Sequence, residues 1–355
     1  MMKKRNLILT GISFVVLILF LIYADKNFDP YKTRILNLCA IYAVLALSMN
    51  LINGFTGLFS LGHAGFIAIG AYTTALLTMS PETKAQNFFM QPIAAPLANI
   101  QLPFPIALIV AGIISAFLAY LIGAPALRLK GDYLAIATLG FAEIIRVVIN
   151  NTQSITNGAL GLKGIPVTTN IWWSFGVFIV TVILMVSFVN SSFGRALKAI
   201  REDEIAAESM GINLFRNKTL AFSIGAFFAG VGGGLLANSL GTIDPTMFKF
   251  MLTFNILLII VLGGMGSITG TVISSFIITI AGEALRFLDE TITIGGYRIQ
   301  GVAGTRMVVF SALLMIAVLF FSKGLMGNRE FSWNGLFGFF KNIGRSKGGS
   351  QDEIA

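Results

Sequence analysis

Cysteine and histidine are almost absent, since the 355 residues hold one of each, Cys39 and His63. One cysteine cannot form a disulfide within the chain, and a zinc site requires several Cys or His ligands. Charge is also scarce, because Asp, Glu, Lys and Arg make up only 12% of the residues. The sequence therefore predicts neither a disulfide framework nor a metal centre. Its composition lies outside the range of soluble globular domains.

A phosphate-binding loop is missing as well, because no Gly-x-x-x-x-Gly-Lys-Ser/Thr run occurs. We therefore expect a protein that is not itself an enzyme and holds no cofactor, so that any ATP it depends on is bound by partner subunits. No soluble ligand-binding domain is recognisable in the sequence. A ligand would then be captured by a separate protein outside the membrane.

Apolar residues dominate what is present: they make up 55% of the chain, and the mean hydropathy is +0.83. A helix needs roughly 20 apolar residues to cross a bilayer, and runs of about that length recur. The fold class predicted is an all-α, polytopic integral membrane protein of about ten transmembrane helices. The first run is read as a retained span, because a small-x-small cleavage site is lacking. The predicted spans are 7–23, 35–52, 58–79, 104–123, 133–150, 171–189, 219–240, 250–266, 268–288 and 303–321.

The formal charge of +9 comes from Lys and Arg that stand between the apolar runs. Such a distribution follows the positive-inside rule and gives no reason to expect a nucleic-acid partner. We expect a multi-pass protein of the plasma (inner) membrane of a bacterium or archaeon, in contact with membrane lipid. Both termini are placed in the cytoplasm, and the loops 80–103 and 150–170 outside.

The polar stretch 191–218 predicts a short amphipathic helix on the cytoplasmic side. It is either a solvated connector or a docking helix for a partner. Small residues between charges, ended by glycine, favour docking because they allow close backbone approach at a compact turn. The domain prediction is a permease domain over 1–325 containing this loop, then a mobile cytoplasmic tail over 326–355. Candidate docking residues are Arg195, Arg201, Glu204, Ala206, Ala207 and Gly211.

Polar side chains inside the apolar runs are candidates for a translocation pathway. Asn50 and Asn53 precede a glycine-rich break and either contact a substrate or satisfy freed backbone groups. His63 either bonds within the bundle or lines the path. Glu143 and Arg146 stand one helical turn apart and form either a structural ion pair or part of the path. The candidate pathway residues are Asn50, Asn53, His63, Thr138, Glu143 and Arg146.

Three runs carry a family resemblance. They are GFTGLFSLGHAGFIAIGAY at 54–72, LRLKGDYLAIATLGFAEIIR at 127–146, and GRALKAIREDEIAAESMGIN at 194–213, the last followed by AFSIGAFFAGVGG at 221–233. In this order they resemble the LivM-type permease subunits of branched-chain amino-acid ABC transporters. The loop 204–212 is similar to the E-A-A-x-x-x-G pattern with which such permeases contact their ATPase. At 156–162 the chain departs from the family pattern, with TNGALGL in place of Thr-Gly-Gly-x-x-Gly.

The resemblance implies import of branched-chain, hydrophobic amino acids, driven by ATP hydrolysis in separate subunits. It implies a homologous LivH-like permease, two cytoplasmic ATPase subunits and an extracytoplasmic substrate-binding protein as partners. A urea or short-chain amide permease of the same superfamily is the nearer alternative. An ion-coupled secondary transporter is the remoter one, because it needs membrane carboxylates free to carry ions, and Glu143 and Glu283 each have an arginine within one turn.

Overall fold

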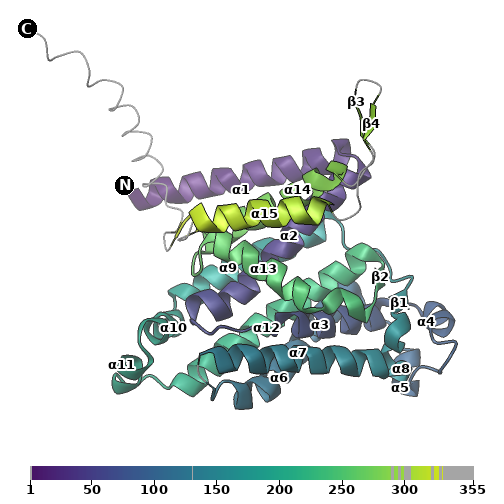
Figure 1. Cartoon of the computed structure of the whole chain (residues 1–355), viewed down its shortest axis with the longest axis horizontal. Helices are drawn as coiled ribbons and strands as arrows, with labels where there is room; N and C mark the ends of the chain where they lie inside the picture. Colours follow the sequence, from purple (N-terminus) through teal and green to yellow (C-terminus); the bar gives the residue numbers. More distant parts are fainter. Residues whose placement is uncertain are drawn as a thin grey trace, which may run out of the picture.

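The computed structural model describes residues 2–129, 131–288, 292–294, 297–299, 305–320, 324–327 and 330. Within them, each of the ten predicted spans coincides with one helix (Figure 1). The prediction of an all-α membrane protein of about ten spans is thereby confirmed. These helices are α1 (Met2–Asn27), α2 (Pro30–Asn50), α3 (His63–Thr78), α6 (Phe104–Ala126), α7 (Asp132–Asn151), α9 (Ile171–Asn190), α12 (Leu214–Leu240), α13 (Phe250–Gly263), α14 (Ile268–Ala284) and α15 (Thr305–Phe320).

Short elements lie in the connections between these helices. The connections contain α4 (Pro81–Asn87), α5 (Ala95–Ala98), α8 (Gln153–Thr156), the 3-10 turns Gly158–Leu160, Pro245–Phe248 and Leu285–Leu288, α10 (Ser192–Glu202) and α11 (Glu204–Ser209). Two antiparallel ribbons pair β1 (Leu162–Lys163) with β2 (Thr242–Ile243) and β3 (Ile292–Ile294) with β4 (Tyr297–Ile299).

The connections divide between the two ends of the bundle. The start of α1 lies at the same end as α10 and α11, on the left of Figure 1, and α4, α5, α8 and the β1–β2 ribbon lie at the other. The loops that the sequence assigns to one side of the membrane thus share one end. The assignment of that end to the cytoplasm stays a prediction from the Lys and Arg distribution.

Length and composition support membrane crossing for much of the bundle. Four helical stretches within the described residues are long and apolar enough to cross a membrane: Pro30–Phe55, Phe104–Ala126, Ile171–Asn190 and Leu214–Leu240. Three shorter apolar helices are α3, α13 and α14. The prediction began α3 at 58, five residues too early, because 56–62 is apolar in composition but not helical.

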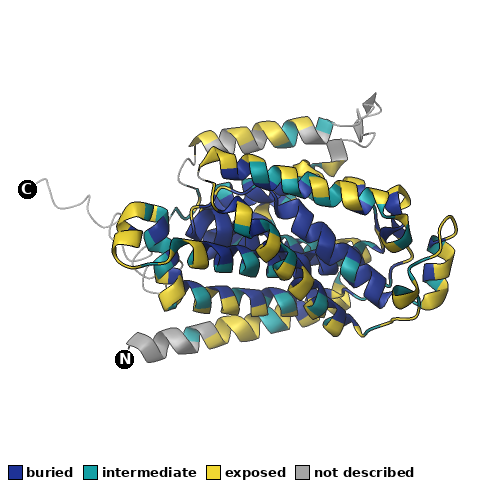
Figure 2. Ribbon diagram, turned by 90° about the horizontal axis from the view of Figure 1, so that it is seen from below, coloured by how far each residue is buried: buried dark blue, intermediate teal, exposed yellow. Residues whose placement is uncertain are grey.

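The core forms around α12, which packs against α6, α3 and α2. Glycines permit this closeness, because a Cβ added at Gly70 would collide with the backbone of Gly230, and one added at Gly233 with the carbonyl of Ile67. Small residues at such crossings are the usual means by which membrane helices approach one another. Figure 2 shows the buried residues gathered in the centre of the molecule.

The outward faces of the peripheral helices are apolar. Residues such as Val16 on α1, Ile113 and Phe117 on α6, and Ile183 on α9 are exposed on the surface of the chain. A soluble monomer rarely shows contiguous apolar patches of this kind. Lipid is the solvent that suits these faces.

Candidate functional site

The first helix break lies where α2 ends. After Asn50 the chain forms a π-helix, η1 (Leu51–Phe55), and then runs without regular structure to His63. Asn53 ties this segment together, since its Nδ2 donates to the Ser60 carbonyl at 3.1 Å and its Oδ1 accepts from the Ser60 amide at 3.3 Å. Irregular backbone at membrane depth persists only where its polar groups are bonded or wet. The Asn53 amide therefore serves the backbone in this conformation.

Two neighbouring helices complete the bonding of the first break. The Leu61 amide donates to Thr138 Oγ1 of α7 at 3.0 Å, and the Ala64 amide donates to Thr253 Oγ1 of α13 at 2.9 Å. Both threonines are buried. The break is thus a junction where α2, α3, α7 and α13 meet.

His63 begins α3 and is buried beside α2. One of its ring nitrogens, Nε2, lies 2.7 Å from Ser48 Oγ, and the same hydroxyl donates to the Leu45 carbonyl at 2.6 Å. A hydroxyl has one proton, so when Ser48 donates it to Leu45, His63 donates through Nε2–H. The histidine is bonded within the bundle, which is the first of the two alternatives that the sequence left open for it.

The second break separates α13 from α14. Gly266 adopts a left-handed φ of 85°, and Ser267 caps α14 by accepting the Gly270 amide at 3.0 Å. Asn50 joins this break to the first. Its Oδ1 accepts from the Gly266 amide at 2.9 Å, and its Nδ2 donates to the Ser267 carbonyl at 3.0 Å and to Thr271 Oγ1 at 2.9 Å. The side chain of Asn50 is 0% exposed and therefore links the two glycine-rich breaks inside the protein.

The predicted docking loop forms two helices in place of one. Asp203 separates α10 from α11, because its side chain accepts from the Ile205 and Ala206 amides and so caps a new helix. Gly211 ends α11 at φ 81°: its amide donates to Glu208 and the Ile212 amide donates to Ala207, the two bonds of a Schellman motif. The compact turn ended by glycine is therefore present.

The new helix directs apolar side chains outward. Leu197 and Ile200 of α10 are buried, but Ile205 and Met210 are 76% and 83% exposed. The single amphipathic helix predicted for 191–218 is wrong at this point, because the cap at Asp203 restarts the helix and changes which positions face the bundle. Ala207 is buried, whereas Ala206 is exposed.

Ionic contacts connect the loop to the bundle. Lys218 of α12 is buried and pairs with Glu204 at 2.5 Å, which fixes the start of α11. Arg201 donates through Nη1 to the Gly54 carbonyl at 3.1 Å while it pairs with Glu202 at 2.7 Å. A Cβ added at Gly266 would also lie against the Arg201 guanidinium. Arg201 therefore contacts both breaks from the loop, whereas Arg195 is exposed and caps α9 through the Asn190 carbonyl.

Helix α7 has two different faces. Thr138 points inward to the first break, whereas Glu143 and Arg146 form an ion pair at 2.7 Å on the surface of the chain, 40% and 25% exposed. The exposed stripe around the pair also holds Tyr133, Ile136 and Ile144. Pathway candidates thus separate into four buried residues at the breaks and two on an outward face.

Several bonding residues at the breaks were not singled out from the sequence. They are Ser48, Thr253, Ser267 and Thr271, all fully buried hydroxyls. An isolated hydroxyl in an apolar run is the available signal, but it does not show which distant backbone group the hydroxyl meets.

The loop 156–162, where the family pattern changes, packs against the β2 end. Asn157 adopts a left-handed φ of 60° and donates to the Gly161 carbonyl at 2.7 Å. Leu162 then pairs with Ile243 in the β1–β2 ribbon. The TNGALGL run therefore closes on itself and on the 241–244 turn.

No three His, Cys, Asp or Glu residues gather as a possible metal site in the described ranges. Cys39 is a buried thiol of α2. The side chains of Asn50, Asn53, Thr138 and Thr253 at the breaks are amides and hydroxyls that bond to groups within the protein.

Known proteins are similar to this chain in sequence. The profile of one family, described as branched-chain amino acid transport system / permease component, matches residues 31–319. The high-affinity branched-chain amino acid transport system permease proteins LivM of Salmonella typhimurium and Escherichia coli are each 36% identical to this chain, over 70% and 72% of it. The chain covers 62% and 64% of their lengths, a little under two thirds.

A second set of relatives carries another name. The permease protein LivH of the same transport system in Escherichia coli is 27% identical over 81% of this chain and 92% of its own. The family profile covers well over half of the chain, so the likeness is not confined to one motif. This multi-pass membrane protein belongs to the family of branched-chain amino acid transport system permease components.

Proposed function

We propose that the chain is the LivM-type permease subunit of an ABC importer that carries branched-chain amino acids across the inner membrane. ATP is bound and hydrolysed by two separate cytoplasmic subunits, a LivH-like permease completes the membrane unit, and an extracytoplasmic protein delivers the substrate. The names of the relatives support the substrate class. Both termini and the α10–α11 loop face the cytoplasm in this proposal.

One observation carries the proposal: the α10–α11 loop presents a contact surface at one end and is bonded to the helix breaks at the other. Ile205 and Met210 are largely exposed on a loop between two membrane helices, beyond the apolar faces that suit lipid. Large exposed apolar side chains on a polar loop are typical of protein interfaces. The ATPase subunit is the partner that this surface receives.

The loop contacts explain how movement of an ATPase would reach the membrane. Glu204 binds Lys218 at the start of α12, and Arg201 binds the Gly54 carbonyl in the first break. A displacement of α10 and α11 therefore pulls on α12 and on both breaks at once. Breaks of this kind are where transporter helices change orientation, and rigid-body rocking about them alternates access.

The outward face of α7 is the part of the pathway that this chain supplies. Its neighbour α6 carries no charged residue, exposes mainly apolar side chains such as Ile109, Ile113 and Phe117, and suits lipid. The α7 stripe instead carries the Glu143–Arg146 pair, which costs free energy in hydrocarbon unless it meets water or a polar partner. A wet interface with the LivH-like permease meets that need.

Replacing Met210 by Asp tests the docking surface. Met210→Asp should lower transport in proteoliposomes at least tenfold and release the ATPase subunits on purification, because a central apolar contact contributes about 2 kcal/mol or more. The matched control is Met90→Asp, exposed at the other end of the bundle. Equal retention of ATPase by both variants would refute the docking assignment.

Neutralising the ion pair tests the pathway. Arg146→Gln alone should reduce assembly, because it leaves the Glu143 carboxylate unpaired, and Glu143→Gln with Arg146→Gln should restore assembly. We expect the double variant to assemble with its ATPase and to transport about tenfold more slowly. Parental transport by that assembled double variant would assign the pair a structural role only.

A further inference from the structure

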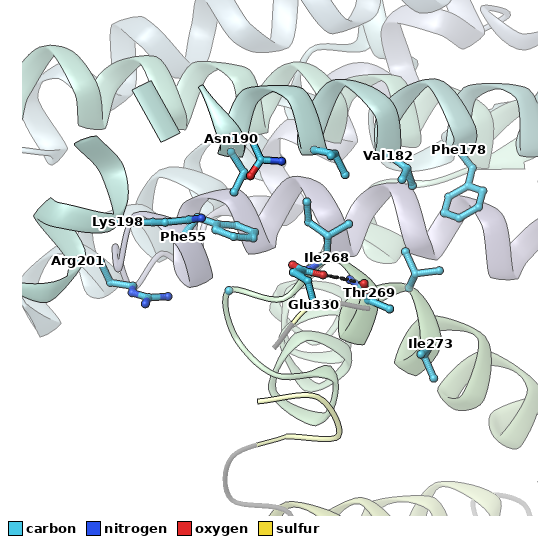
Figure 3. A pocket seen from close by; sticks show the side chains of 14 residues that line it. Phe55, Phe178, Val182, Asn190, Lys198, Arg201, Ile268, Thr269, Ile273 and Glu330 are labelled. Atoms are coloured by element: carbon cyan, nitrogen blue, oxygen red, sulfur yellow. Dashed lines mark hydrogen bonds between the residues drawn. The ribbon is translucent and has the colours of Figure 1, made fainter. Parts of the chain in front are cut away.

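A cavity of about 650 Å³ opens between α9 and α14 at the end of the bundle that carries α10 (Figure 3). Its long walls are apolar, formed by Phe178, Val182, Val272 and Ile273. Its other end is polar and is formed by Asn190, Lys198 and Arg201. Figure 3 shows the two ends on opposite sides of the view, with Lys198 reaching across to Phe55.

The polar end has an uncommitted cation. Lys198 Nζ lies 5.9 Å from the centroid of the Phe55 ring, and Lys198 forms no ion pair with any residue that the structure describes. The carboxylate in the cavity, that of Glu330, is already bound by three donors. They are the Ile268 amide at 2.6 Å, the Thr269 amide at 3.0 Å and Thr269 Oγ1 at 2.7 Å. Glu330 thus caps α14, and the Lys198 charge faces the cavity.

From Phe178 to its polar end, the cavity is about as deep as one membrane leaflet. Phe178 and Asn190 are separated by about 18 Å along α9, at a rise of about 1.5 Å per residue. One leaflet of a hydrocarbon core that is about 30 Å thick measures about 15 Å. A lipid that lies along this wall would place its acyl chain against the apolar side chains and its anionic headgroup beside the cation at the polar end.

We propose that this cavity binds an anionic phospholipid, with an acyl chain between α9 and α14 and the phosphate at Lys198. The cavity opens from helices whose outer faces suit lipid, so a lipid reaches it from the bilayer. A free phosphate would satisfy Lys198 but would leave the apolar walls unfilled. The site is separate from the α7 face and does not depend on the proposed transport activity.

Lipid binding to the purified complex that contains the full chain tests the proposal. Native mass spectrometry would compare phosphatidylglycerol with phosphatidylcholine of the same acyl chains. We expect about a fivefold preference for phosphatidylglycerol, the factor that corresponds to one lysine near a membrane surface. Lys198→Gln should remove the preference. The control variant Lys26→Gln should retain it, because Lys26 is exposed near the C-terminal end of α1, away from the cavity.

A second pair of variants tests the apolar wall. Val182→Phe fills the cavity and should reduce binding of both lipids, whereas Val180→Phe, on the exposed face of the same helix, should not. Equal binding of the two lipids by the parent, or an unchanged preference in Lys198→Gln, would overturn the proposal. Displacement by glycerol phosphate as effective as that by phosphatidylglycerol would overturn it as well, because the cavity would then be a site for a free anion.

Discussion

The two helix breaks use the same residue type, glycine, but are held in different ways. The first, from Leu51 to Gly62, is closed on itself by Asn53 and is bonded to a hydroxyl of α7, and a hydroxyl of α13 accepts from Ala64 in the first turn of α3 that follows. The second, between α13 and α14, is short and is held by Asn50 from the neighbouring helix and by Glu330 and the Leu325 and Met326 amides from the C-terminal segment. The first break is therefore a junction of several membrane helices, and Asn50 is the α2 side chain that joins the second break to it. A movement that starts at the first break would reach the second through Asn50.

The largest effect is expected from Asn50→Leu, which removes the bond between the breaks. It leaves the Gly266 amide without its side-chain acceptor, at a cost of about 1–3 kcal/mol, and also removes the bonds that Asn50 donates to the Ser267 carbonyl and to Thr271. Asn53→Leu should cost less, because Asn53 forms two side-chain hydrogen bonds and Asn50 forms three. Thermal unfolding in detergent measures both, with the exposed Asn27→Leu as control. A greater loss of thermal stability in Asn53→Leu than in Asn50→Leu would contradict the expectation that the bond between the breaks contributes more than the bonds within the first break.

An intermediate effect is expected from Arg201→Gln, which removes the loop contact with the first break. A hydrogen bond from a charged donor contributes about 1.5–3 kcal/mol. We expect ATP hydrolysis to persist while transport per ATP falls about tenfold. Arg216→Gln is the matched control, since Arg216 is exposed at the start of α12 and is not among the docking candidates. Equal coupling in the two variants would show that the loop acts on the bundle by another contact.

The smallest effect is expected from Thr138→Val and Thr253→Val. Each keeps the side-chain shape and removes one acceptor from the first break, at a cost of about 1 kcal/mol. The two sites lie on different helices. The double variant should therefore lose more unfolding free energy than the sum of the two single variants only if the break acts as one unit. A chemical denaturation series on the four proteins measures this coupling. Strict additivity would mean that the α7 and α13 contacts act independently.

The sequence was sufficient for the helices and for much of the loop. Ten apolar runs predicted ten helices, because hydrophobic length is a local property of the chain. The role of Gly211 as the end of a compact turn also followed from local pattern. The start of α3 did not, because residues 56–62 are apolar in composition while their backbone is bonded to distant side chains.

The sequence identified candidate residues for the site but did not predict which of them lie together. Asn50, Asn53, His63 and Thr138 are polar groups in apolar runs, as identified, and the structure buries them at the breaks. Glu143 and Arg146 are on a separate outward face. Spacing along a helix predicts which residues share a face, but not whether that face meets the core or the surface.

By itself, the sequence determined that this protein is a helical membrane protein, where its ten long apolar helices lie and which polar residues they carry. Composition and run length are enough for this, because the bilayer requires every span to satisfy its own backbone. Only the tertiary structure decided that Asn50 joins the two breaks, that Arg201 touches them from the loop, and that Ile205 and Met210 face outward. These contacts join residues up to 221 positions apart, and their partners depend on how the glycine-rich helices pack.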